Sequence, residues 1–356
     1  MNKKVGIVTV YGENNYGNKL QNYASIKIYE KLGYKVETVR VIQSRMITKN
    51  KDKIKNIIKK SIKIIPKYRY FNNQFIKEKK FKSFSNNYLH IVGNFNTYNV
   101  NMDFIKKYDY LSIGSDQVWN DTDFNKNDVE YFLLDKVDGE KIIALSPSFG
   151  KDSILYDNRE IFIRNLSKYK SISCREEAGA QLITKLTARN CKVLVDPTMA
   201  LSKDEWEKIE RQPLWLTSDN FATCYFLGGI DKYKDNIEKE CAKNYITVID
   251  ILNKRNIEYT TSPEEFLYLI HKSNIVYTDS FHACVFSIIY DKRFVIYHRS
   301  NQESEMESRI STLLCMFGIN HIEYGKVYDP SKFLNKENTL KEKREELIEY
   351  VKNSLR

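Results

Sequence analysis

The sequence lacks the features that mark several common classes of protein. Its six cysteines form no C-x-x-C pair, and its five histidines do not recur at the short spacings of zinc ligands. We therefore expect free, mostly buried thiols in a reducing compartment, and no bound metal. No G-x-G-x-x-G follows the first apolar strand, so a nicotinamide cofactor is disfavoured and no cofactor is expected.

Long apolar runs are also missing. A membrane-spanning helix needs ~18 apolar residues, and no window of the sequence reaches that length. The apolar run at 5–10 is too short for the core of a secretion signal. These absences predict a cytoplasmic protein.

Positive charge, in contrast, is in excess. The 356 residues carry a formal net charge of +11, and their length suits two domains. Such a charge predicts an acidic partner, which is a nucleic acid, an anionic membrane surface or a phosphorylated small molecule.

Short apolar stretches alternate with helical patterns along the chain, which predicts parallel, doubly wound sheets. In the first half, strands are predicted at 5–10, 35–41, 108–113, 142–146, 171–175 and 191–195, and helices at 18–32, 159–169 and 176–189. In the second half, strands are predicted at 221–227, 246–251, 274–277 and 293–297, and helices at 232–243 and 263–272.

We therefore predict an α/β fold of two Rossmann-like domains that face each other across a cleft, with a C-terminal helix packing back. The predicted parts are an N-terminal domain at 1–200, a linker at 201–218, a C-terminal domain at 219–330 and the C-terminal helix at 331–356. Ligands of such sheets bind at the carboxyl ends of strands.

A basic insertion at 45–85 is assigned to the N-terminal domain. Between Arg45 and Lys82, fourteen lysines and arginines stand against two acids. Isoleucines recur there at helical spacing and aromatic residues follow, a pattern typical of helices that lie on a membrane surface. The alternative is a solvated helix whose isoleucines pack on the N-terminal domain. Nucleic acid is disfavoured, since no recognised module accompanies the charge.

The stretch at 278–287 is the most informative. An apolar strand gives way to an apolar helix, with Ser280 as the expected N-cap and His282 in the first turn. The N-terminus of a helix attracts anions, and a histidine beside an anion site is a candidate proton donor.

Polar loops follow other predicted strands. Hydrogen-bonding groups gather in two of these loops, and those of the first loop are neutral and suit sugar hydroxyls. They are Asn14, Asn15, Tyr16, Asn18, Gln21, Ser115, Asp116 and Gln117. Arg175 and Glu176 follow a third strand, and we expect these two side chains to pair with each other.

Together these motifs resemble the polysaccharide pyruvyl transferase family in order and spacing over about residues 5–320, with GSDQVWN at 114–120 and TDSFH at 278–282 the most specific. The resemblance implies a GT-B-like fold with an N-terminal acceptor side and a C-terminal donor side. It also implies a transferase of exopolysaccharide or cell-envelope biosynthesis. The reaction moves the enolpyruvyl unit of phosphoenolpyruvate, a co-substrate, to a sugar as a pyruvate ketal.

The family's catalytic histidine corresponds to His282, with Asp279 to orient it or to accept the sugar proton. Well-studied members carry Arg-Leu before this histidine and Gly-Thr after it, where this chain has Ser280-Phe281 and Ala283-Cys284. The residues expected to bind the donor are Ser280, Arg309, Arg299, His298 and Gly228.

Two alternatives stay open. The missing arginine is compatible with a GT-B-type glycosyltransferase that uses a nucleotide-sugar donor, and with a non-catalytic protein of glycan assembly. The expected partners are a glycan or lipid-linked oligosaccharide acceptor and, through 45–85, the inner face of the plasma membrane.

Overall fold

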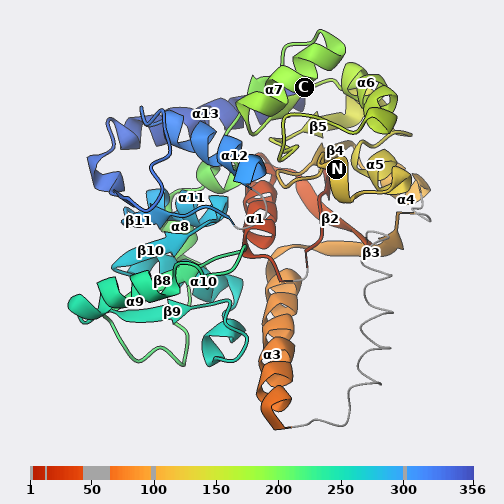
Figure 1. The fold of residues 1–356 in the computed structure, drawn as a ribbon. Coiled ribbons are helices and arrows are strands. Elements are labelled where there is room, and N and C mark those ends of the chain that lie inside the picture. The colour runs from red at the N-terminus through yellow and green to blue at the C-terminus, as the bar shows by residue number, and fades with distance from the viewer. Residues whose placement is uncertain (1–2, 13, 43–64, 98–101, 300–302) are drawn as a thin grey trace. The chain divides into compact units, whose positions relative to one another are not determined.

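The computed structural model describes residues 3–12, 14–42, 65–97, 102–299 and 303–356 (Figure 1). The chain forms two compact units, each made of segments that are distant in the sequence. Unit 1 comprises Met1–Ile65, Ser85–Ala200 and Lys343–Arg356. Unit 2 comprises Pro66–Phe84 and Leu201–Glu342.

Unit 1 is built on a five-stranded parallel sheet. Its strands are β1 (Lys4–Val8), β2 (Lys35–Ile42), β3 (Ile91–Asn96), β4 (Tyr110–Ile113) and β5 (Ile142–Ala144), in the order β3-β2-β1-β4-β5. β1 and β4 are almost wholly buried, as expected of central strands in a parallel sheet that is covered on both faces. The strand order reverses between β1 and β4, and sheets of this kind bind ligands at such a reversal.

Helix α1 (Tyr16–Lys31) follows β1, and local residues set both of its ends. Asn15 is the N-cap, because its Oδ1 accepts the N–H of Asn18 at 3.1 Å. Gly33, with φ of +84°, lets the chain turn away after the helix. Unit 1 also holds α4 (Met102–Lys106), α5 (Lys126–Phe132), α6 (Arg159–Lys168), α7 (Glu177–Thr187) and the paired short strands β6 (Ser173–Cys174) and β7 (Lys192–Val193).

The C-terminal helix α13 (Lys336–Ser354) packs back on unit 1, as predicted. The hydroxyl of Tyr350 donates to the carbonyl of Ala144 at 2.8 Å. The hydroxyl of Tyr110, on β4, donates to the carbonyl of Leu355 at 2.7 Å. Two buried tyrosines therefore join the C-terminal end of the chain to β4 and β5.

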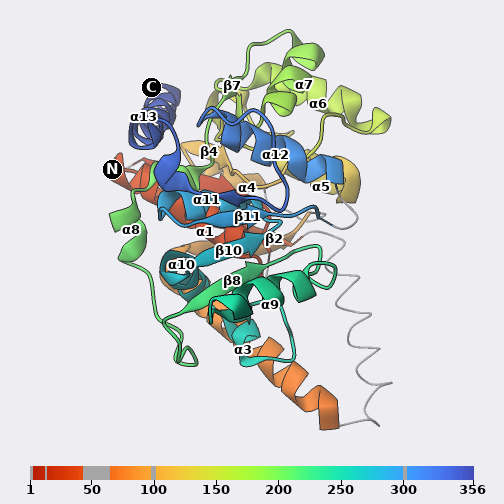
Figure 2. The same ribbon diagram turned by 60° about the vertical axis from the view of Figure 1, so that its left-hand side comes forward.

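Unit 2 contains a second doubly wound sheet (Figure 2). Its strands are β8 (Phe221–Tyr225), β9 (Thr247–Asp250), β10 (Ile275–Thr278), β11 (Phe294–Ile296) and β12 (Val327–Tyr328), in the order β12-β11-β10-β8-β9. All neighbours pair in parallel except β11 and β12. Here the order reverses between β8 and β10. The predicted α/β class with two Rossmann-like halves is confirmed, while the cleft between them stays a prediction.

In unit 2, one short helix precedes the first strand, and a helix follows each of β8, β9, β10 and β11. These helices are α8 (Lys203–Glu207), α9 (Lys234–Lys243), α10 (Pro263–Lys272), α11 (Phe281–Ile289) and α12 (Glu303–Cys315). α11 is almost wholly buried and packs against both α10 and α12. This burial explains why nearly every residue of α11 is apolar, and it fixes the helix that carries His282.

One segment falls in a different unit from the one expected. Most of α3 (Ile65–Tyr88) belongs to unit 2, although the insertion at 45–85 was assigned to the N-terminal domain. Asn73 donates through Nδ2 to the carbonyl of Asn256 at 2.8 Å, and Lys80 donates to both carboxylate oxygens of Glu265 at 2.8 Å. These polar contacts, which hydrophobic patterning does not reveal, hold α3 on unit 2. The isoleucine-rich part of the insertion, at 43–64, lies outside the described residues.

Lys77 is buried on the same side of α3, and its titration gives a prediction. Burial and the neighbouring Lys254 lower the pKa of Lys77 to about 7, with Asp250 acting in the opposite direction. In the unfolded chain a lysine titrates near pH ~10.4. Between these two pH values the lysine is protonated in the unfolded chain and neutral in the folded protein. Burial of Lys77 therefore lowers the free energy of unfolding most below pH 7, and this destabilisation becomes smaller as the pH rises towards 10.

We expect Lys77→Met to raise the free energy of unfolding on the order of a few kcal/mol more at pH 6 than at pH 9.5. Denaturant unfolding at both pH values measures the difference from wild type. Lys79→Met, at an exposed position on the same helix, is the matched control and should show no such pH dependence. An increase in the free energy of unfolding of Lys77→Met that is equal at both pH values would contradict the lowered pKa of Lys77.

Candidate functional site

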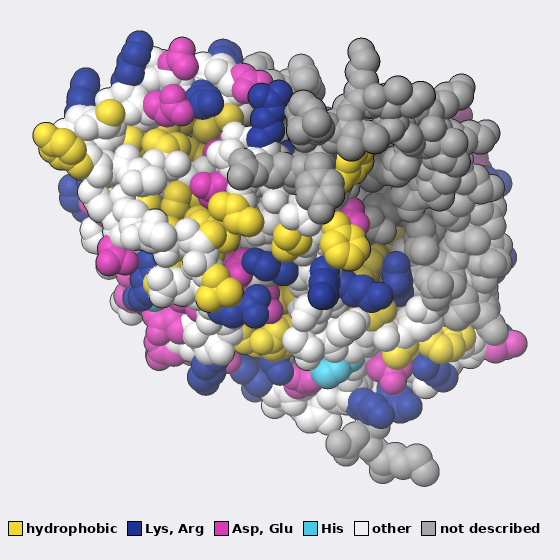
Figure 3. Space-filling model, turned by 90° about the horizontal axis from the view of Figure 1, so that it is seen from below, with side chains coloured by type: hydrophobic (Ala, Val, Ile, Leu, Met, Phe, Trp, Pro, Cys, Tyr) yellow, Lys and Arg dark blue, Asp and Glu magenta, His cyan; other side chains and the backbone are white. Residues whose placement is uncertain are grey.

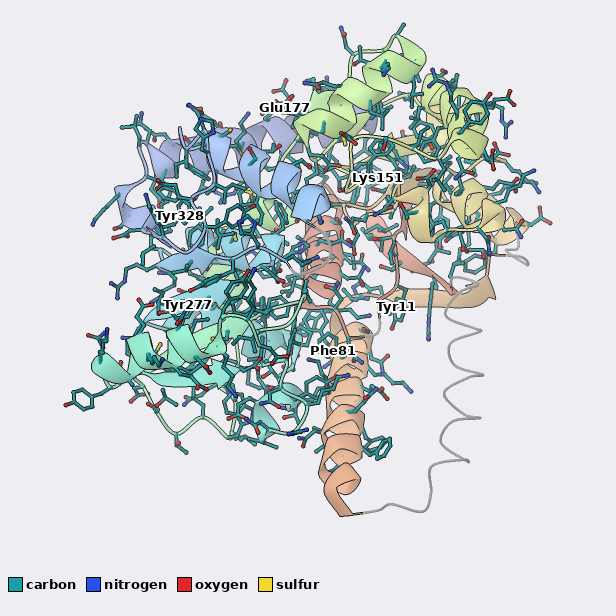
Figure 4. All side chains as sticks on the ribbon, in the orientation of Figure 1. Tyr11, Phe81, Lys151, Glu177, Tyr277 and Tyr328 are labelled. Atoms are coloured by element: carbon teal, nitrogen blue, oxygen red, sulfur yellow. The ribbon has the colours of Figure 1, made fainter. Side chains whose placement is uncertain are left out.

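A buried aspartate organises the loop after β10, which carries the predicted catalytic residues. Oδ1 of Asp279 accepts the N–H of Leu227, and Oδ2 accepts the N–H of Gly228, both at 2.7 Å. These N–H groups lie in the loop after β8, the neighbouring strand at the reversal of the strand order. Tyr277, labelled in Figure 4, is on β10 two residues before Asp279. Asp279 therefore ties the two loops of the reversal together.

Arg299 reaches the same group from the loop after β11. Its Nη2 donates to the carbonyl of Asp279 at 3.2 Å, and its Nε lies 3.4 Å from Oδ2. The side chain is 12% exposed. A positive charge is thus held at the carboxyl ends of three adjacent strands.

Helix α11 begins directly after this loop, and His282 is its second residue. Ser280 occupies the N-cap position, but its hydroxyl makes no capping hydrogen bond; its backbone N–H donates to Oγ1 of Thr278 at 2.9 Å. His282 is half-buried, and its ring lies edge-on to Phe281 at 5.3 Å between centroids. The first turn of α11 therefore combines an ionisable ring with the positive end of a helix.

Cys284, two residues after His282 on α11, is a buried thiol. Burial, followed by the charge of Asp279, raises the pKa of its thiol well above the usual range. A neutral thiol is a poor nucleophile, so Cys284 is not a candidate for nucleophilic chemistry.

Two other residues predicted to bind the donor lie on neighbouring elements. His298 is exposed, stacks on the ring of Tyr324 and accepts the hydroxyl of Tyr233 at its carbonyl, 3.0 Å away. Arg309 is buried on α12, the helix that packs against α11. The structure thus brings together Asp279, Gly228 and Arg299, with Ser280 next in the chain.

The predicted acceptor residues of unit 1 form a connected hydrogen-bond network where the strand order reverses between β1 and β4. Nδ2 of Asn18 donates to Oδ2 of Asp116 at 2.9 Å, and Oδ1 of Asn18 accepts the N–H of Gly12 at 3.0 Å. Oε1 of Gln21 accepts the N–H of Ser115 at 3.2 Å. The side chains of Asn18, Gln21 and Asp116 therefore use hydrogen bonds to hold the two loops together.

The other four predicted acceptor positions surround that network. Tyr16 is fully buried, Asn15 caps α1, and Gln117 packs so closely on Gly150 that a Cβ there would lie 2.1 Å from its Nε2. Oδ1 of Asn14 is buried and has no hydrogen-bond partner among the described residues. Asn14 thus keeps an acceptor that a ligand hydroxyl would satisfy.

A second buried aspartate, Asp196, anchors this network. It was not among the predicted site residues. Oδ2 of Asp196 accepts Nη1 of Arg175 at 2.6 Å and Oγ of Ser115 at 3.0 Å, while its Oδ1 accepts the N–H of Thr198 at 2.9 Å. Burial acts to lower the pKa of Arg175. The negative charges nearby, of which Asp196 has the largest effect, outweigh burial and raise this pKa above its ordinary value. Its sequence signal is the segment Asp196-Pro197-Thr198, which belongs to the motifs that resemble the family.

The expected pairing of Arg175 with Glu176 is wrong. Oε1 of Glu176 instead accepts the N–H of Phe149 at 2.8 Å and the hydroxyl of Ser148 at 3.1 Å. The backbone is extended at Glu176, and consecutive side chains of extended backbone point to opposite sides. Each of the two charges therefore meets a different partner.

Within the described part of the chain, no group of three or more His, Cys, Asp or Glu side chains is arranged to hold a metal ion. None of the helices described there has the length and apolar character needed to cross a bilayer.

Comparison with known proteins places these loops in context. The sequence profile of the family described as polysaccharide pyruvyl transferase matches residues 15–301. No curated protein gives a significant match. Among solved structures, UDP-GlcNAc 2-epimerase from Neisseria meningitidis is 9% identical, with a TM-score of 0.45 and coverage of 99% of this chain and 100% of that chain. MnaA of S. aureus with UDP is 10% identical, with a TM-score of 0.48 and coverage of 98% and 90%. Neither likeness bears on the reaction.

The geometry around Asp279 predicts a structural cost for its neutralisation. Asn in its place offers one acceptor oxygen instead of two and loses the attraction to Arg299, so the N–H of Leu227 or of Gly228 loses its acceptor. We expect Asp279→Asn to lower the free energy of unfolding by about 2–4 kcal/mol in urea. Asp231→Asn, at an exposed position of unit 2, is the control. An equally small decrease in the free energy of unfolding in both variants would contradict the role of Asp279 in holding the two loops together.

Proposed function

The chain belongs to the polysaccharide pyruvyl transferase family, and we propose that it transfers the enolpyruvyl unit of phosphoenolpyruvate to a sugar of a polysaccharide intermediate. The observation that carries the proposal is the position of His282, in the first turn of α11 directly after the loop held by Asp279 and Arg299. It supplies a proton donor and positive charge where sheets of this type bind ligands.

His282 is the proposed general acid. Its imidazolium gives a proton to the methylene carbon of phosphoenolpyruvate, whose π electrons form the new C–H bond and leave an oxocarbenium-like centre. A sugar hydroxyl oxygen bonds to this centre, and its proton returns to the imidazole. A second hydroxyl of the same sugar then displaces phosphate, which leaves with the electron pair of the C–O bond and takes up the remaining proton. The products are a cyclic pyruvate ketal and inorganic phosphate.

The negative charges of phosphoenolpyruvate need a cation that residue 280, a serine, does not supply. Arg299 supports this role, because its guanidinium is held beside the loop that leads into α11. Arg309 and the N-terminal end of α11 are the other sources of positive charge. Asp279 is then a positioning residue, since both of its carboxylate oxygens already accept hydrogen bonds.

Loss of the imidazole should remove the activity without unfolding the protein. We expect His282→Asn to lower phosphate release from phosphoenolpyruvate, with glycan extract as acceptor, by at least about 100-fold. Its thermal midpoint should stay near that of wild type. His321→Asn, an exposed histidine of unit 2, is the matched control and should keep full activity.

Equal phosphate release by wild type and His282→Asn would overturn the proposal. Turnover of a nucleotide sugar in that case would favour the glycosyltransferase alternative. Stabilisation by glycan, with turnover of neither donor, would favour a non-catalytic role in glycan assembly.

We also propose that α3 contacts an anionic membrane surface on the cytoplasmic side, which would bring a lipid-linked acceptor to the enzyme. Phe71 and Phe75 on α3 are 52% and 66% exposed, and Lys79 and Lys82 are exposed at helical spacing on the same side. Figure 3 shows hydrophobic side chains among Lys and Arg on the face seen from below. Exposed aromatic rings beside lysines suit the headgroup region of a bilayer.

Charge reversal on α3 tests this contact. Each lysine near an anionic leaflet contributes ~1 kcal/mol, so Lys79→Glu with Lys82→Glu should weaken binding to vesicles of phosphatidylglycerol and phosphatidylcholine by about tenfold or more. The difference should shrink at high salt. Lys239→Glu with Lys243→Glu, exposed on α9, carries the same change in net charge. Equal weakening in both double variants would contradict a specific role for α3.

A further inference from the structure

A tyrosine at the carboxyl ends of the unit 1 strands lies against two cations. Nζ of Lys19, on α1, is 3.6 Å from the centroid of the Tyr11 ring, and Cζ of Arg40, on β2, is 4.6 Å from the same centroid. Tyr11, labelled in Figure 4, follows β1 and lies in unit 1 with both cations. Two elements therefore direct positive charge at one ring.

The two cations at this ring repel each other. The two distances keep the cations within about 8 Å of each other, so they repel by roughly 2 kcal/mol at an effective dielectric constant of about 20. Each cation–π contact returns only ~0.5–2 kcal/mol. An anion between the charges would replace repulsion by attraction.

Arg40 has an unused hydrogen-bonding group. Its Nε is buried without a hydrogen-bond partner, and its guanidinium forms no salt bridge within the described residues. Asp116, the acid of the neighbouring hydrogen-bond network, accepts Nδ2 of Asn18 and the N–H of Gln117 with its two carboxylate oxygens. The planar donors of arginine match the oxygens of a phosphate group.

We propose that Tyr11, Lys19 and Arg40 form a phosphate-binding site on the acceptor side, which takes the phosphate group of a phosphorylated saccharide. Lys19 is 1% exposed and acts through its charge, whereas the half-buried Arg40 donates hydrogen bonds. The site adjoins Asn18 and Asp116, where the strand order of unit 1 reverses. The identity of the ligand as the acceptor rests on the proposed function, but phosphate binding does not.

Inorganic phosphate and glucose 1-phosphate are the probes, and binding is measured by calorimetry and by the shift in thermal midpoint. Because phosphate also suits the donor site of unit 2, the measurements are made in an Arg299→Gln background. We expect Arg40→Gln to weaken binding of both probes at least tenfold, with an unliganded midpoint equal to or above that of its parent. Arg40→Lys, which keeps the charge, should retain part of the binding.

Lys27→Gln is the matched control, because Lys27 also lies on α1 over a tyrosine ring but is paired with Glu30. It should bind both probes like its parent. Equal affinity of Arg40→Gln and its parent would overturn the proposal. A loss of unliganded stability in Arg40→Gln and Arg40→Lys alike would also overturn it, because it would indicate a structural arginine. His282→Asn should lose turnover of phosphoenolpyruvate but bind inorganic phosphate as wild type does. This result would show that the phosphate site exists independently of the proposed reaction.

Discussion

In each unit, a buried aspartate joins a loop at the reversal of the strand order to a neighbouring loop. Asp279 accepts two backbone N–H groups of the loop after β8 and faces Arg299 from the loop after β11. Asp196 accepts Ser115 from the loop after β4 and pairs with Arg175 from the loop after β6. A buried carboxylate is costly unless its oxygens are hydrogen-bonded, so each clamp forms only when several loops are placed together. The positions of the candidate site residues depend on this condition.

The clamps change the role expected of several polar residues. Asn18, Gln21, Ser115 and Asp116 are predicted acceptor contacts, yet their hydrogen bonds first hold the loops of unit 1. Asp279 likewise holds the loop that leads into α11, and His282 is the ionisable side chain of the first turn of that helix. Preorganised loops of this kind suit a transferase, because charges that are already in place need no rearrangement as the reaction proceeds.

Much of the fold follows from local patterning. The strand at 274–277 and the helix after Ser280 are found as β10 and α11, because an apolar run and a capping residue mark them. β3 was missed because Gly93 and two asparagines dilute its apolar pattern, and β12 because it has only two residues. The placement of α3 on unit 2 was missed because its partners lie more than 180 residues away in the chain.

The α/β class, the two sheets, the C-terminal helix and the candidate histidine can be predicted from the sequence, since each depends on periodicity or on a short motif. The charge pairs become known only from the folded structure. Arg175 pairs with Asp196 and not with its neighbour Glu176. Arg299 contacts Asp279. Arg40 and Lys19 lie over the ring of Tyr11. The physical reason is that electrostatic and hydrogen-bonding partners are selected by distance in space, and the crossing of strands and helices sets that distance.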